Sequence, residues 1–169
     1  MSTVKAKPVA PVPSIERVIA LASAQVGVKE KPGNRTKYGV WFGMDGVAWC
    51  GIFVSWCYGQ IFPASPLRGI QTRLGFAGTQ AAWRWAQKNG HAFQTPKLGD
   101  IVIWRHTPST GHCGIVTRVD PKDPKEFSSV EGNTDPGFSR TGGMVGKHIH
   151  RIGDGRHDVL LGFLRPILT

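Results

Sequence analysis

The pattern of apolar and polar residues divides the chain into a helical first half and a strand-rich second half. Apolar residues recur at helical spacing from Ile15 to Val26. Ser14 precedes this run as a candidate N-cap, and Gly27 lies near its end. The pattern therefore predicts an amphipathic helix that begins after Ser14.

Two further helices are predicted before the change of pattern. The apolar run from about Trp49 to Gln60 predicts the first, and Gly43 and Gly46 permit a tight backbone just before it. The second is predicted at about 79–88, with Thr79 as candidate N-cap and Gly90 beyond its end.

After Pro96 the period changes to that of strands. Short runs rich in β-branched residues alternate with turns that contain Pro, Gly and Asp. Helices followed by strands predict an α+β fold, with N-terminal helices packed on an antiparallel β-sheet. The predicted strands are Asp100–Arg105, His112–Val119, Phe127–Glu131, Val145–Arg151 and Val159–Leu164.

Length and composition fit one domain. The chain has 169 residues, of which 40% are hydrophobic, enough for a core. We predict a flexible Pro-rich arm at 1–13 and a single domain at 14–169. No apolar run approaches the roughly 18 residues of a membrane span. The first residues lack the apolar stretch of a secretory signal, so no signal peptide is predicted.

The net charge of +10 predicts an anionic partner or substrate surface, or else simply keeps the protein soluble. The basic residues are spread along the sequence, without a dense tract or a recognisable nucleic-acid module. We therefore expect no specific nucleic-acid partner and favour an anionic surface, such as polymers of the bacterial wall.

Three polar sites fit cysteine-dependent acyl transfer. Cys50 begins an apolar helix, His112 lies in a predicted strand, and Glu131 and Asn133 follow on another. A helix start favours a thiolate by only about 0.3–1 kcal/mol. A neighbouring imidazole forms a thiolate–imidazolium pair, and Gly111 next to His112 leaves it space, as does Gly114. Cys50 is thus the candidate nucleophile and His112 the candidate base.

The rest of the predicted site is less sharply defined. Glu131 and Asn133 alternate on a strand, so we expect both on one face, one orienting His112 and the other ordering the site or binding substrate. The Cys50 N–H is a candidate oxyanion donor. Candidate substrate-binding residues are Asn34 and Tyr38, as second oxyanion donors, and Trp41 and Trp49, as walls of a groove.

The remaining cysteines and histidines predict no metal or cofactor. Cys57 and Cys113 are expected in the core. His148 and His150 share one strand face, but together with His157 they lack a carboxylate or cysteine at ligand spacing.

Four segments carry a family resemblance. They resemble the CHAP family of cysteine amidohydrolases and peptidases, over about residues 14–166. The resemblance implies a papain-like fold, cleavage of bacterial peptidoglycan, Cys50 as nucleophile, His112 as base, and Glu131 with Asn133 completing the site. The segments are Trp49–Trp56, Leu98–Trp104, Gly111–Val116 and Val130–Thr134.

Two departures from the family matter. Some members bind calcium through an acidic loop before the nucleophile, whereas this loop offers only Asp45, too few ligands for calcium. Many members carry a separate wall-binding domain, and we expect the positive charge to substitute for it here.

The resemblance predicts a phage lysin that cleaves an amide of the stem peptide, the cross-bridge or the lactyl-peptide linkage. An endolysin, made in the host cytoplasm and released to the wall at lysis, is favoured over a virion-associated lysin with phage tail proteins as partners. The alternative is a non-catalytic wall-binding or phage tail structural module with a CHAP-like fold. The intact Cys50, His112, Glu131 and Asn133 set argues against this alternative.

Overall fold

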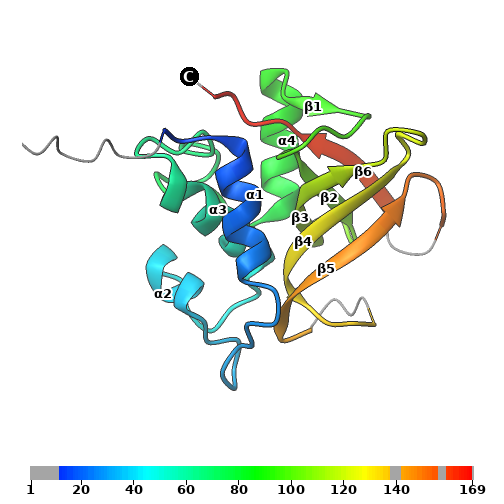
Figure 1. Cartoon of the computed structure of the whole chain (residues 1–169). Coiled ribbons are helices and arrows are strands. Elements are labelled where there is room, and N and C mark those ends of the chain that lie inside the picture. The colour runs from blue at the N-terminus through cyan, green and yellow to red at the C-terminus, as the bar shows by residue number, and fades with distance from the viewer. Residues whose placement is uncertain (1–11, 138–141, 156–158, 169) are drawn as a thin grey trace, which may run out of the picture.

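Helices cover one face of a six-stranded antiparallel sheet (Figure 1) in a computed structural model that describes residues 12–137, 142–155 and 159–168. The helices are α1 (Ile15–Ala24), α2 (Lys37–Phe42), α3 (Cys50–Ile61) and α4 (Thr79–Asn89). The strands are β1 (Ala92–Phe93), β2 (Ile101–Arg105), β3 (Gly111–Val119), β4 (Glu126–Thr134), β5 (Met144–Arg151) and β6 (Val159–Leu164).

The strand order is β1-β6-β2-β3-β4-β5, so β3 lies between β2 and β4. In this register Trp104 of β2 is opposite His112 of β3. Phe127 of β4 is opposite His150 of β5. Because paired residues lie on the same face of a sheet, the register decides which polar side chains meet.

Both faces of the sheet are buried. Ile101 and Ile103 belong to the large hydrophobic core shared with the helices. Val102 and Trp104 alternate with them along β2 and belong to a smaller cluster with Phe127. Since successive residues of a strand point to opposite faces, the smaller cluster lies on the face away from the helices.

The predicted α+β class is confirmed, and so is the first helix. The Ser14 side chain accepts a hydrogen bond from the Arg17 N–H at 3.4 Å, which caps α1. The prediction that Thr79 caps the third helix is wrong, because Gly78 is the N-cap and Thr79 is the first helical residue. The Thr79 hydroxyl accepts from the Gln80 amide instead.

Two elements were not predicted. Helix α2 has six residues and β1 has two, and neither is long enough for a period to be visible in the sequence. Residues 1–11 of the predicted arm lie outside the described residues, so the division into arm and domain remains a prediction. Among the described residues no helix has the length and apolar character needed to cross a membrane.

Candidate active site

Cys50 is the first residue of α3, and the loop before it has the expected tight backbone. Gly43 and Gly46 both adopt a φ of 81°, in the left-handed region that favours glycine. Trp49 is the N-cap, but its side chain makes no capping hydrogen bond. As the first helical residue, Cys50 has a backbone N–H without a partner inside the helix.

His112 and Glu131 form a direct pair between neighbouring strands. The His112 Nε2 lies 2.8 Å from the Glu131 Oε2, and the Glu131 side chain is buried. Gly114 makes room for this contact, because a Cβ there would lie 2.5 Å from the Glu131 Cγ. The Trp104 ring stacks on the His112 ring, with centroids 5.9 Å apart. Glu131 therefore holds the imidazole in one orientation.

The Cys50 sulfur interacts with the first residues of β3. Hydrogen bonds from the Cys113 thiol, from His112 and from the Gly51 N–H, together with the positive charge of His112, lower the pKa of Cys50 well below its usual range, although burial opposes this. Burial also opposes the charged form of His112, but its interactions with Cys50 and Glu131 raise its pKa to about 10. The two groups therefore favour a thiolate–imidazolium pair at neutral pH.

The second oxygen of Glu131 has partners that the sequence did not reveal. The His150 Nε2 lies 2.7 Å from the Glu131 Oε1, and the Ser129 hydroxyl donates to the same oxygen at 2.5 Å. Burial would raise the pKa of Glu131, but hydrogen bonds from His112 and His150 outweigh it and lower that pKa. The alternation of His148 and His150 was visible in the sequence, but the β4–β5 register that brings His150 to Glu131 was not.

Asn133 is not a second partner of His112. Its backbone has a φ of 57°, and the β4–β5 register shifts between Glu131 and Thr134. The expectation that Glu131 and Asn133 share one face is therefore wrong, because this irregularity breaks the alternation. The Asn133 Oδ1 accepts from the Trp49 N–H at 3.0 Å. Asn133 thus fixes the backbone just before Cys50.

A comparison with known protein families places this chain. The model of the CHAP domain family matches residues 42–133, more than half of the chain, and this segment includes Cys50, His112, Glu131 and Asn133. The chain belongs to the CHAP domain family. No curated protein matches the sequence.

A solved structure shares the fold. The wild type endolysin LysIME-EF1 superposes with a TM-score of 0.54 at 19% sequence identity. The match covers 90% of this chain and 63% of the endolysin chain, so this CHAP protein spans less than two thirds of its neighbour's length.

The candidate substrate-binding residues of this CHAP domain are placed differently from expectation. Tyr38 is fully buried and Trp49 is 1% exposed, which contradicts a role in contacting substrate. Their rings stack, and the Trp49 Nε1 donates to Glu30 at 2.7 Å. The two side chains instead support the loop that precedes Cys50.

Trp41 packs against α3 away from Cys50. A Cβ on Gly59 would lie 2.6 Å from the Trp41 ring, and Gly59 follows Cys50 by about 13 Å along α3. Trp41 as a wall of a groove beside Cys50 is therefore contradicted. Asn34 lies in the Lys31–Arg35 turn, and its role as an oxyanion donor remains a prediction.

The other cysteines are core residues, as predicted. Cys57 and Cys113 are fully buried, and burial raises the pKa of both thiols. The hydrogen bond from Cys113 to the Cys50 sulfur was not foreseen. His157 lies outside the described residues. Within the described ranges, no group of three His, Cys, Asp or Glu side chains is arranged to hold a metal ion.

Gly132 allows β4 to approach the start of α3. A Cβ at this position would lie 2.7 Å from the Phe53 Cβ and from the Trp49 ring, both of which are buried. We expect Gly132→Ala to lower the free energy of unfolding by about 1–3 kcal/mol, because this part of the core is already full. Urea denaturation measures the change. Gly137→Ala is the control, since its Cβ would meet only the Asp135 side chain. Equal stability of the two variants would contradict the prediction.

Proposed function

We propose that this CHAP protein is a peptidoglycan hydrolase that cleaves an amide bond by a cysteine mechanism. The observation that carries the proposal is that Cys50, at the start of α3, interacts with His112, near the start of β3, and that His112 is paired with Glu131. Cys50 has a lowered pKa, and His112 is held by Glu131 at 2.8 Å. A non-catalytic module would need neither an activated thiol nor an oriented imidazole.

In the first half of the reaction, the Cys50 thiolate attacks the carbonyl carbon of the scissile amide. The developing oxyanion accepts a hydrogen bond from the Cys50 N–H, which is free for this role at the helix start. The tetrahedral intermediate collapses as the C–N bond breaks, and the His112 imidazolium gives its proton to the departing amine. The products are a thioester on Cys50 and a neutral imidazole.

In the second half, water attacks the thioester. His112 accepts one proton from the water, and the hydroxyl group adds to the carbonyl carbon. The C–S bond then breaks, which releases the carboxylic acid and restores the thiolate–imidazolium pair. The short contact to Glu131 keeps His112 in one tautomer throughout.

The biological setting that we propose is lysis of a bacterial host by a phage. The likeness to the endolysin LysIME-EF1 supports an endolysin that acts on the wall at lysis more than a virion-associated lysin. The bond that is cleaved lies in the stem peptide, the cross-bridge or the lactyl-peptide linkage, and the fragments released distinguish the three.

The test is release of new amino groups from purified peptidoglycan of several chemotypes, with fragments identified by mass. We expect release by the wild-type protein and none by Cys50→Ala. A new N-terminus on the lactyl-linked residue indicates an amidase, and one within the peptide indicates an endopeptidase. No release from any chemotype would overturn the proposed function in favour of a non-catalytic module.

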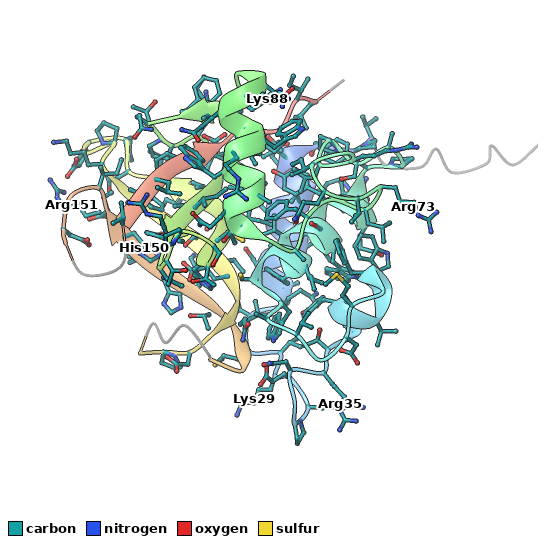
Figure 2. All side chains as sticks on the ribbon, turned by 180° about the vertical axis from the view of Figure 1, so that it is seen from behind. Lys29, Arg35, Arg73, Lys88, His150 and Arg151 are labelled. Atoms are coloured by element: carbon teal, nitrogen blue, oxygen red, sulfur yellow. The ribbon has the colours of Figure 1, made fainter. Side chains whose placement is uncertain are left out.

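We also propose that positive charge draws the protein to anionic wall polymers. The labelled cations Lys29, Arg35, Arg73, Lys88 and Arg151 lie around the outline of the molecule rather than in one patch (Figure 2). With a net charge of +10, the attraction is long-range and is screened by salt.

We expect the hydrolysis rate to depend strongly on salt when whole walls are the substrate, and only then. Between low and high salt, the hydrolysis rate of walls that retain their anionic polymers should fall by on the order of tenfold, because the Debye length shrinks. The rate on a soluble muropeptide should change little. Walls stripped of anionic polymers provide the control, and equal salt dependence of stripped and intact walls would rule out the proposed attraction.

A further inference from the structure

The carboxylate of Glu131 is held at both oxygens. One oxygen contacts His112 at 2.8 Å, and the other contacts His150 at 2.7 Å and the Ser129 hydroxyl at 2.5 Å. The partners come from β3, β5 and β4, so three neighbouring strands converge on one side chain. Glu131 is 2% exposed and His150 is 8% exposed. These contacts are therefore shielded from water.

The register of the sheet explains why His150 reaches this site. His150 is opposite Phe127 in the β4–β5 pair, and its ring lies against Phe127 and Trp104, with centroids 5.4 and 4.8 Å apart. Aromatic contacts on two sides leave the imidazole little rotational freedom. The Nε2 is thereby fixed toward Glu131.

A buried carboxylate needs such anchoring. An ionised side chain out of water is costly unless hydrogen bonds satisfy it, and a glutamate has three rotatable side-chain bonds. With only His112 as partner, the Glu131 side chain would be held at one oxygen and would retain other rotamers. A second anchor at the opposite oxygen fixes the carboxylate plane and therefore the line from Oε2 to the imidazole.

We propose that His150 is a positioning residue of the active site, which fixes Glu131 so that Glu131 in turn orients His112 beside Cys50. This proposal deepens the proposed function and rests on it for the catalytic readout. His150 does not contact the nucleophile. It acts through Glu131, and Ser129 assists at the same oxygen.

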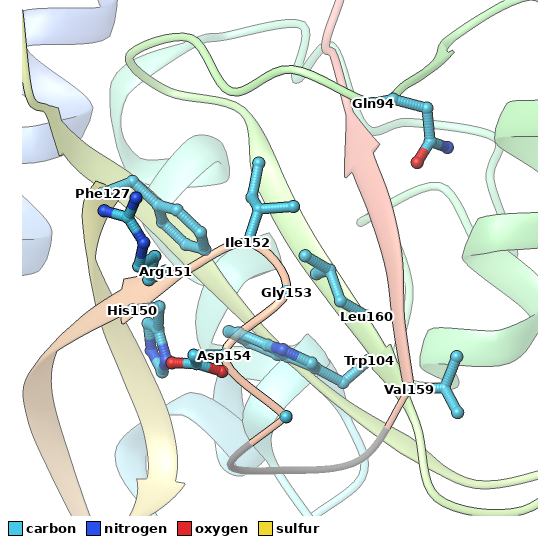
Figure 3. A pocket seen from close by; sticks show the side chains of 11 residues that line it. Gln94, Trp104, Phe127, His150, Arg151, Ile152, Gly153, Asp154, Val159 and Leu160 are labelled. Atoms are coloured by element: carbon cyan, nitrogen blue, oxygen red, sulfur yellow. The ribbon is translucent and has the colours of Figure 1, made fainter. Parts of the chain in front are cut away.

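The buried His150 side chain borders a pocket. Together with Trp104, Asp154 and Leu160, it lines a pocket of about 380 Å³ on the sheet face away from the helices (Figure 3). Among the described residues that line this pocket, Arg151 and Asp154 carry a charge. The hydrogen-bonded network therefore runs from His112 through Glu131 to a pocket wall.

The experiment compares two changes at His150 with one matched control. His150→Phe keeps a ring but removes the donor, whereas His150→Gln keeps a side-chain N–H donor. His148→Phe is the control, because His148 lies on the same face of β5, is 6% exposed, and contacts the Thr134 hydroxyl instead of Glu131. Kinetics on a soluble muropeptide give kcat and KM separately.

For His150→Phe we expect kcat to fall by about 10- to 100-fold with little change in KM. Losing a residue that orients a site residue by a hydrogen bond typically has an effect of this size. We expect His150→Gln to recover most of the lost kcat and His148→Phe to stay near wild type. If His150→Gln is as impaired as His150→Phe, or if His148→Phe loses as much kcat, His150 has only a structural role and the proposal is overturned.

A second readout needs no wall substrate. The rate of Cys50 alkylation by iodoacetamide, followed by peptide mass, reports the thiolate fraction as a function of pH. Glu131 is hydrogen-bonded to His112, Ser129 and His150, whereas His148 is hydrogen-bonded to Thr134 and interacts with Glu131 through charge. A more mobile Glu131 stabilises the His112 imidazolium less, so the pKa of Cys50 should rise. The pH midpoint of Cys50 alkylation should therefore move to higher pH in His150→Phe only.

The two readouts separate the two proposals. If the wild-type protein cleaves no peptidoglycan but the alkylation midpoint moves in His150→Phe and returns in His150→Gln, the proposed function fails and the positioning role stands. If the protein cleaves peptidoglycan and neither kcat nor the midpoint responds to His150→Phe, the positioning role fails and the proposed function stands.

Discussion

Replacement of Cys50 by alanine is expected to abolish hydrolysis of peptidoglycan while leaving the fold intact. Removing the nucleophile of a comparable triad costs about 10⁶-fold in kcat, so no amine release above background should remain. Cys50 is small and 6% exposed, and alanine fits the same space. Amine release measures activity, and circular dichroism with urea denaturation measures the fold.

The matched control is Cys57→Ala. Cys57 lies two turns later on the same helix and is fully buried, but it has no interaction with His112. We expect this variant to lose some stability and to keep its kcat. Undiminished hydrolysis by folded Cys50→Ala would exclude the cysteine mechanism.

Replacement of Glu131 by glutamine is expected to lower kcat by about 10²- to 10⁴-fold, the range that the loss of a triad carboxylate suggests. Glu131 accepts hydrogen bonds from His112, His150 and Ser129. The glutamine amide has one acceptor oxygen, and its NH₂ group would face a donor. The variant therefore keeps the shape of the site and loses the orientation of His112.

The Glu131→Gln substitution should also shift the pH dependence of kcat, in a direction that the His112 pKa determines. The interactions with Cys50 and Glu131 raise the pKa of His112 to about 10, so in the wild type the alkaline limb of kcat should lie near that pH. Without the Glu131 anion the pKa of His112 falls, and the alkaline limb of the kcat profile should move to lower pH. A pH profile of kcat, together with an NMR titration of His112, measures the shift.

The free energy of unfolding should also depend on pH through these two shifted pKa values. The raised pKa of His112 adds stability that is fully present below 6.5 and is lost as the pH rises toward about 10. The lowered pKa of Glu131 adds stability that is present above 4.5 and is lost as the pH falls further. The stability difference between wild type and Glu131→Gln should therefore be largest between 4.5 and 6.5.

Glu126→Gln is the control for Glu131→Gln. Glu126 lies on the same strand and pairs with the exposed Arg118 at 3.2 Å, a contact of little energetic value. We expect no change in kcat or in its pH profile. An alkaline limb that stays in place in Glu131→Gln would show that Glu131 does not set the pKa of His112.

Much of the fold could be predicted because apolar residues recur at a regular spacing in the longer helices and strands. The helix after Ser14 extends over enough residues for apolar spacing to specify both its type and its buried face. Elements below about two turns, such as α2, carry no such signal. Caps are also poorly specified, since Gly78 and Thr79 are both acceptable at the start of α4.

The site could be predicted only in its residue types. Cys50, His112 and Glu131 stood out by chemistry and order, but the role of Asn133 depends on an irregularity between β4 and β5 that no alternation reveals. His150 was visible only as a strand histidine. Its contact with Glu131 follows from strand register, which is set by turns and core packing across the whole sheet.

The hydrogen bond between the Trp49 N–H and Asn133 joins positions 84 residues apart. During synthesis, the segment that carries Cys50 leaves the ribosome well before β4 exists. Until the sheet closes, the Cys50 thiol has the ordinary pKa of about 8.5 and is mostly protonated. We therefore expect the raised thiolate fraction to arise only with the last long-range contacts, so that nascent chains and N-terminal fragments carry a Cys50 thiol of ordinary reactivity.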